Sequence, residues 1–205
     1  MDKSPYPLPE IRSASMSDAE EVADILAEAF STDPVMGWMY GNTQPQRVTF
    51  LELAMGVYLR QGFGHVAEGG AAALWLPAHV DVKLPLMGGL RMLFLSLLRS
   101  GGLGALKRGH VMEQAMQAGH PEAPHYYLFA VGVRRKMTGR GLGGRIIREG
   151  LRRADEAGAP AYLENSNPKN TPLYERLGFK TIAPLALPAG APQLLGMMRP
   201  VGAPQ

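Results

Sequence analysis

The sequence predicts a single α/β domain in which helices are layered on a mixed, mostly antiparallel sheet. The chain has 205 residues, of which 46% are apolar, and this is enough for one domain with a buried core but marginal for two. Segments with strand and helix patterns follow one another through the second half. Among them, YYLFAVGV at 126–133 is a continuous apolar run of β-forming residues, which is typical of a strand buried on both faces.

The first half predicts two helices and three strands. A short strand is expected over 11–15, and the helix after it begins with Ser17 and Glu20, which have the S-x-x-E spacing of a capping box. Residues 47–62 predict a second helix. The glycine pair at 69–70, between two apolar runs, predicts the turn of a β-hairpin.

Residues 84–100 are the most apolar stretch of the chain, and over 84–118 we expect one or two helices that cover the sheet. Arg91 interrupts the run at 84–100, which is also shorter than the roughly 20 residues that a membrane span needs. Prolines and charges occupy the first ten residues, where a signal peptide would be apolar. We therefore expect no membrane partner.

Four further elements complete the predicted fold. They are a helix over 144–157 that stops at Gly158, a strand over 159–165, a short helix that begins at Asn170 or Thr171 and ends at Gly178, and a closing antiparallel pair over 179–188 and 193–200.

Cysteine is absent from the sequence, which excludes disulfide bonds, thiolate zinc sites and a cysteine nucleophile. A chain without cysteine fits a reducing compartment, so the expected localisation is cytoplasmic. The five histidines show no metal-ligand spacing, and we predict no metal site.

The charge distribution indicates the kind of ligand. The net charge is +3, yet residues 134–153 alone hold eight Arg or Lys and a single acid, Glu149, so the rest of the chain is negative. Proteins that bind nucleic acid spread basic residues widely. A basic cluster around one glycine-rich loop instead favours a compact, phosphate-bearing ligand.

That loop, TGRGLGG at 138–144, can be interpreted in more than one way. Gly139-x-Gly141-x-x-Gly144 has the dinucleotide-binding pattern, with Glu164 where an acid would meet a ribose. However, five residues separate the strand from the first glycine, and too few residues follow for the further βα units of such a domain. A P-loop is excluded because no Gly-Lys-Ser/Thr follows. Backbone N–H groups at the start of a helix, beside arginines, can also cradle a pyrophosphate.

This last interpretation leads to a family resemblance. The stretch AVGVRRKMTGRGLGGRII (130–147) resembles the cofactor motif of the GNAT acetyltransferase superfamily, a strand ending in V-x-V followed by R/Q-x-x-G-x-G/A at a helix start. Gly141 and Gly143 match the motif glycines, whereas Thr138 replaces the usual Arg or Gln. ENSNPKNTPLYERLGF (164–179) is similar to the second family signature. Within the superfamily, the order and spacing of the second half resemble the puromycin N-acetyltransferase group.

The resemblance implies a sheet whose fourth and fifth strands are parallel and splay apart, so that acetyl-CoA fills the gap like an added strand. It also divides the chain into an acceptor-side half (8–80), a helical cover (84–118) and an acetyl-CoA-binding half (125–199). Gly132 is a candidate position for a β-bulge. The residues that the resemblance places on acetyl-CoA are Val131, Gly132, Val133, Thr138, Gly139, Arg140, Gly141, Leu142, Gly143, Gly144, Asn170 and Tyr174.

Two residues are candidates for the chemistry. Tyr174 matches the family tyrosine, and a phenol with a reference pKa of about 10 stays protonated at neutral pH, so it can donate to the departing sulfur. Glu164, at the end of the fifth strand, is the first candidate for the general base. His125, Asp33 and a chain of water molecules remain alternatives.

The expected function is direct transfer of an acetyl group from acetyl-CoA to the primary amine of a small molecule. Three alternatives stay open: a protein or peptide N-acetyltransferase, a non-catalytic acyl-CoA-binding module, and an enzyme for a longer acyl donor. The expected partners are the amine substrate and no nucleic acid. The sequence leaves open the acceptor and the oligomeric state, a homodimer included.

Overall fold

The computed structural model describes residues 8–41, 46–78, 80 and 103–204. The first part of the predicted helical cover, up to residue 102, lies outside the described residues. The second part is helix α6 (Leu103–Gly119), as the sequence predicts.

The described strands form one seven-stranded sheet in the order β1-β2-β3-β4-β5-β7-β6. Every neighbouring pair is antiparallel except β4 and β5, which are parallel. This confirms the predicted fold class, the hairpin and the closing pair. The strands are β1 (Ile11–Ala14), β2 (Phe63–Ala67), β3 (Ala71–Leu76), β4 (Tyr126–Val133), β5 (Ala161–Asn165), β6 (Lys180–Pro184) and β7 (Leu195–Arg199).

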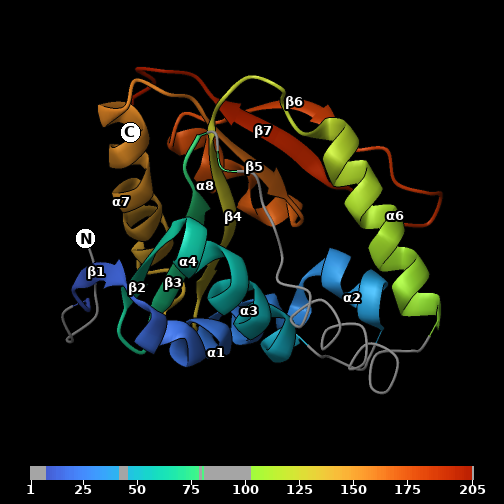
Figure 1. Ribbon diagram of the computed structural model, residues 1–205, viewed down its shortest axis with the longest axis horizontal. Helices are drawn as coiled ribbons and strands as arrows, with labels where there is room; N and C mark the ends of the chain where they lie inside the picture. Colours follow the sequence, from blue (N-terminus) through green and yellow to red (C-terminus); the bar gives the residue numbers. More distant parts are fainter. Residues whose placement is uncertain (1–7, 42–45, 79, 81–102, 205) are drawn as a thin grey trace.

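Helices cover both faces of this sheet (Figure 1). Helices α1, α3 and α4 lie on one face, α7 and α8 lie on the other, and α6 flanks the molecule beside α2. Besides α6, the α-helices within the described residues are α1 (Ala19–Ala29), α2 (Pro34–Tyr40), α3 (Gln46–Leu53), α4 (Leu59–Gln61), α7 (Leu142–Glu156) and α8 (Thr171–Arg176). A π-helical turn at Ala54–Tyr58 joins α3 to α4, so the helix predicted over 47–62 is interrupted in its middle.

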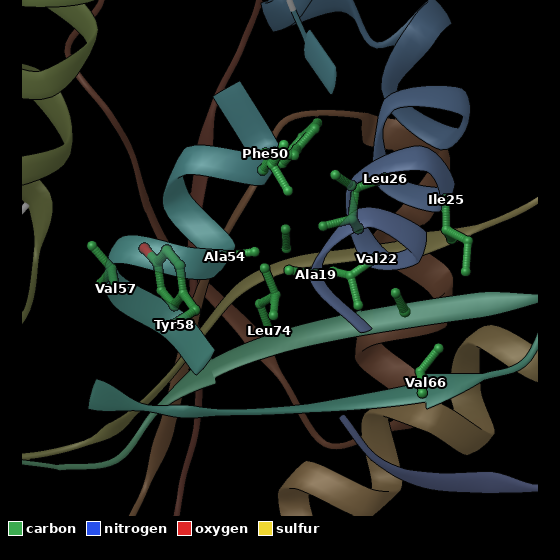
Figure 2. Packing of buried hydrophobic residues seen from close by; sticks show 14 of the residues in the cluster. Ala19, Val22, Ile25, Leu26, Phe50, Ala54, Val57, Tyr58, Val66 and Leu74 are labelled. Atoms are coloured by element: carbon green, nitrogen blue, oxygen red, sulfur yellow. The ribbon is translucent and has the colours of Figure 1, made fainter. Parts of the chain in front are cut away.

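The first core layer lies between α1, α3 and the sheet. Figure 2 shows Val22 and Leu26 of α1 facing Phe50 and Tyr58 above the strands. The α1 residues Val22, Ile25 and Leu26 are fully buried. Burying side chains of this size contributes roughly 1.5–3 kcal/mol each, which is why the helical spacing of α1 fixes its orientation on the sheet.

The second core layer places α7 on the opposite face. Ile146, Ile147 and Leu151 of α7 are completely buried against Trp75 of β3. Gly150 permits this approach, because a Cβ atom on it would lie 2.2 Å from the Trp75 ring. Helix α7 can therefore sit close to the sheet only with glycine at this position.

Strands β4 and β5 separate soon after they begin. Their only paired residues are Tyr126 with Ala161 and Tyr127 with Tyr162. Beyond Tyr127, the edge of β4 that faces β5 has no strand partner among the described residues. The predicted gap between the fourth and fifth strands is therefore present.

Two local predictions were wrong. The first is the capping box of α1: the box lies earlier, at the start of a 3-10 turn, where the Ser15 amide and hydroxyl both donate to Asp18 Oδ2, at 2.7 and 2.8 Å. A 3-10 turn at Met16–Asp18 precedes α1, and Arg12 holds Asp18 from β1, so Ser17 and Glu20 do not form the box.

The second error concerns the β-bulge of β4. The pairing with β3 shifts between Leu74, opposite Ala130, and Trp75, opposite Leu128, so the extra residue is Phe129 and not Gly132. Gly132 serves a different purpose: a Cβ atom there would lie 2.8 Å from the Ala29 Cβ. This glycine lets α1 approach the sheet.

Candidate active site

The glycine-rich loop follows β4 and lies at one end of the β4–β5 gap. Gly139 and Gly141 have φ values of +76° and +79°, and nothing lies within 4 Å of a Cβ atom placed on either. Gly141 is the N-cap of α7, so the free N–H groups of the first helical turn follow directly. A Cβ atom on Gly143 would make ordinary van der Waals contact, at 3.4 Å, with Val133. The loop thus offers backbone donors with little side-chain obstruction.

The side chains of this loop are engaged locally. Thr138 Oγ1 donates to the Arg135 carbonyl at 2.8 Å, Arg140 Nη1 lies 3.2 Å from Met137 Sδ, and Leu142 is buried in the core. The Thr138 amide also donates to the Arg135 carbonyl, at 3.3 Å, so both polar groups of Thr138 stabilise the loop itself.

Part of the basic cluster has a structural role. Arg134 donates to Glu28 of α1 at 2.7 Å, and the Arg135 side chain donates to Ser31. The Arg135 amide, followed by Arg134, lowers the pKa of Glu28 by hydrogen bonding to its carboxylate. These contacts tie the end of β4 to α1, so the positive charge of Arg134 is shared with an acid.

Tyr174 lies on α8, on the second side of the gap. Its side chain is buried in the core layer of α7, and burial, followed by the charge of Asp33, raises its pKa. A raised pKa keeps the phenol protonated well above neutral pH, as a proton donor requires.

Asp33 does not have the free carboxylate that a general base needs. Its Oδ1 accepts from the amides of Val35 and Met36 and caps α2, and its Oδ2 accepts from Ser166 Oγ at 2.6 Å. Ser166 directly follows β5, so Asp33 fixes α2 to the carboxyl end of that strand. The structure assigns Asp33 a structural role.

The turn between β5 and α8 is held by asparagines other than Asn170. Asn165 Nδ2 donates to Thr171 Oγ1, and Asn167 Oδ1 accepts from the Lys169 amide. Asn170 occupies the N-cap position of α8, is exposed and makes no side-chain capping bond.

Glu164 is the centre of a buried polar cluster. Only 4% of its side chain is exposed, and Tyr127 donates to its Oε2 at 2.6 Å across the gap. His120 Nδ1 lies 3.5 Å from Oε1, and His120 Nε2 lies 3.0 Å from His125 Nε2. Burial, followed by the charge of Glu164, raises the pKa of Tyr127 and Tyr162. The cluster thus combines a carboxylate with two imidazoles.

A pocket of about 330 Å³ opens beside this cluster. His120, His125 and Tyr127 form its polar wall, and Glu122 adds an acid. The remaining lining is mainly apolar: Leu76, Pro77, Val80, Pro121, Ala123 and Pro124. Such a concave site, partly open to solvent and with a few convergent polar groups, can bind a small molecule.

Only part of this site could be predicted from the sequence. Glu164 and His125 were predicted separately as candidate bases, whereas His120, Tyr127 and Tyr162 were not predicted as site residues. The available signal was His120-Pro-Glu-Ala-Pro-His125, two histidines in a proline-bounded turn directly before β4. The structure brings Glu164 and His125 together and places Tyr174 and Asp33 in a separate group.

The described parts of the chain lack two other kinds of feature. They contain no group of three or more His, Cys, Asp or Glu residues suited to a metal ion. They also contain no helix with the length and apolarity to cross a membrane.

Comparison with known proteins agrees with the fold and the loop. Residues 89–179 match the acetyltransferase (GNAT) family. The chain carries a GNAT acetyltransferase domain. An uncharacterized N-acetyltransferase of Schizosaccharomyces pombe is 28% identical over 179 residues, which are 79% of this chain and 70% of the relative.

Solved structures share the complete GNAT fold. A Corynebacterium glutamicum structure described as histone acetyltransferase HPA2 and related acetyltransferase has a TM-score of 0.69 and 25% identity, with 97% of this chain and 99% of that chain covered. Drosophila melanogaster polyamine N-acetyltransferase has a TM-score of 0.62 and 16% identity, with coverages of 94% and 100%. This protein is therefore an acetyl-transferring enzyme, and its similar structures include proteins with different kinds of acceptor.

Proposed function

We propose that this enzyme transfers the acetyl group of acetyl-CoA directly to the primary amine of a small molecule. The observation that carries the small-molecule assignment is the pocket beside Glu164. It measures about 330 Å³ and combines apolar lining residues with the polar side chains of His120, Glu122, His125 and Tyr127. This volume lies in the range of small-ligand sites and is too small for a folded protein surface.

The residues of the gap fit acetyl-CoA. The edge of β4 at Val131, Gly132 and Val133 faces away from β3 without pairing to β5. At the end of this edge, Gly139 and Gly141 hold the loop open before the first N–H groups of α7. A pantetheine amide could pair with such an edge, and a pyrophosphate could accept from such a helix start. Asn170 and Gly143 complete this proposed set.

The chemistry requires one proton acceptor and one proton donor. The amine attacks only when neutral, so its ammonium form must lose a proton before the new N–C bond forms and the C–S bond breaks. We assign proton uptake to the cluster around Glu164. Tyr174, which burial keeps protonated at neutral pH, donates its proton to the departing sulfur, and it regains a proton from the second N–H that the attacking nitrogen loses as the amide forms.

The decisive measurement is release of CoA thiol from acetyl-CoA with a panel of amines. The panel includes polyamines, arylalkylamines and puromycin, the last because of the sequence resemblance. Tyr174→Phe should lower kcat by about 10²-fold or more with unchanged acetyl-CoA binding, because it removes only the proton donor. Phe179→Leu, a change at the ring that packs against Tyr174, is the control for packing.

Two results would contradict this proposal. Thiol release with peptides but not with small amines would instead support a protein acetyltransferase, the second candidate, which the C. glutamicum similarity favours. Binding of acetyl-CoA without thiol release for any amine or peptide would exclude the proposed acetyl transfer.

A further inference from the structure

The cluster around Glu164 contains two imidazoles whose hydrogen atoms can be assigned from their partners. His125 Nδ1 lies 2.7 Å from the Ala123 carbonyl oxygen, which can only accept, so Nδ1 carries a hydrogen. Burial is the main cause that lowers the pKa of His125. His125 is therefore neutral at neutral pH, and its Nε2 is a bare acceptor.

The tautomer of His120 follows from that of His125. His120 Nε2 lies 3.0 Å from the bare His125 Nε2 and must donate to it. A neutral His120 then has its lone pair on Nδ1, which lies 3.5 Å from Glu164 Oε1. Two acceptors consequently face each other, and Oε1 accepts no hydrogen bond of normal geometry from the described residues, although a contact with the Glu164 carboxylate contributes to the raised pKa of Tyr162.

This arrangement is stabilised when one proton is added. A proton on His120 Nδ1 would turn the contact between two acceptors into a charge-assisted contact between imidazolium and carboxylate. Tyr127 already donates to the other oxygen, Oε2, and thereby fixes the carboxylate. The site is thus prepared to accept a single proton at His120.

His120 is accessible from the pocket, whereas Glu164 is buried. The side chain of His120 lines the pocket and is 37% exposed, whereas the side chain of Glu164 is 4% exposed and does not belong to the pocket lining. The other titratable groups that face this pair are Tyr58, Tyr127 and Tyr162, whose raised pKa values keep them neutral, together with Glu122 at the pocket wall. An acceptor in the pocket therefore meets His120 first.

We propose that His120 takes the proton from the acceptor ammonium, with Glu164 as the buried carboxylate that holds the resulting imidazolium. The N–H bond of the ammonium breaks, an Nδ1–H bond forms, and the positive charge moves from the amine to the imidazole. His120, being partly exposed, later gives this proton to water. This inference rests on the proposed function, which places the amine in this pocket.

The test is a His120→Gln variant, with His110→Gln as the matched control, since His110 lies on the exposed surface of α6. Glutamine can still donate to His125 but cannot take up a proton. His120→Gln should lower kcat/KM for the amine by about 10²-fold at pH 7, and its activity should rise about tenfold per pH unit as the amine loses its proton in solution. The KM for acetyl-CoA should not change.

Two further measurements separate a proton acceptor from a structural residue. His120→Ala should regain activity when imidazole is added, whereas a residue needed only for packing would not be rescued. In the wild-type protein, ¹⁵N shifts of the ring nitrogens at pH 8 should report hydrogen on His120 Nε2 and His125 Nδ1.

The outcomes separate this inference from the proposed function. A His120→Gln variant with the wild-type rate and pH profile, in an enzyme that acetylates small amines, would overturn the role of His120 alone. Absence of turnover with every amine would overturn the proposed function. The opposite tautomers in the ¹⁵N spectrum would overturn the inference even without an active substrate.

Discussion

The two ends of the β4–β5 gap are built in different ways. The glycine-rich loop is one continuous stretch, 138–144, and its proposed ligand-binding groups are backbone N–H groups whose positions depend on positive φ at Gly139 and Gly141. The Glu164 cluster is assembled from the α6–β4 turn, β4 and β5, and its functional groups are side chains. One region depends on chain conformation and the other on tertiary contacts between titratable groups.

This difference predicts which property each region controls. A backbone cradle carries no titratable group, so changes in the loop should alter the affinity for acetyl-CoA at every pH. The Glu164 cluster is proposed to exchange a proton, so changes there should alter turnover and its pH dependence while leaving acetyl-CoA affinity intact. Three substitutions test this separation.

The largest effect is expected at Glu164. Glu164→Gln removes the carboxylate that holds the added proton and places an amide donor beside His120, so kcat should fall by about 10²–10³-fold with an unchanged KM for acetyl-CoA. Steady-state kinetics with both substrates varied provide the measurement. Glu113→Gln, at an exposed position of α6, is the control. A raised KM for acetyl-CoA with normal kcat would mean that the two regions are not separate.

A smaller effect, on stability, is expected at Gly150. The new Cβ of Gly150→Ala would lie 2.2 Å from the Trp75 ring, so α7 must move away from β3. Overpacking of this kind costs about 1–3 kcal/mol, which urea unfolding would measure. The loop precedes α7 directly, so acetyl-CoA affinity should also fall.

The control for this substitution is Gly109→Ala, in the middle of α6, where a Cβ meets nothing within 4 Å. It should stabilise the protein by about 0.5–1 kcal/mol, because alanine is the better helix former. If Gly150→Ala and Gly109→Ala changed the free energy of unfolding equally, the close packing of α7 against Trp75 would not contribute to stability.

The same contrast explains what could be predicted from the sequence. The strand at 126–133, the glycine loop and the stop at Gly158 each depend on neighbours in the chain, and these local signals predicted them correctly. The gap between β4 and β5 followed from the family resemblance to that same continuous motif.

The Glu164 cluster depends on distant residues, and prediction was incomplete there. No spacing relates His120 to Glu164, because only the pairing of β4 with β5 brings them within 3.5 Å. The capping box failed for a similar reason: Arg12, on β1, binds Asp18 and helps to place the box at Ser15. The bulge was assigned to Gly132 because a glycine in a strand suggests one, whereas here the glycine makes room for α1.

The smallest effect is expected at Gly141, where a substitution changes the backbone conformation without creating a steric clash. Its φ of +79° disfavours any residue with a Cβ, although the space around that Cβ is open. Gly141→Ala should therefore bias the loop away from its geometry at a cost of about 1 kcal/mol. Such a cost corresponds to a rise of about fivefold in the KM for acetyl-CoA, with the pH profile of kcat unchanged.

Gly190→Ala is the control for Gly141→Ala, because it introduces similar backbone strain far from the proposed acetyl-CoA site. Gly190 has a φ of +86° and equally open space, yet it lies in the β6–β7 connection, away from the loop. Both variants should lose similar stability in urea, because both place alanine in the same disfavoured conformation. Only Gly141→Ala should weaken acetyl-CoA binding. Suppose that Gly141→Ala leaves the KM for acetyl-CoA unchanged, while both variants lose the same free energy of unfolding. The loop then does not hold the pyrophosphate through its backbone, and the basic side chains around it must provide the affinity instead.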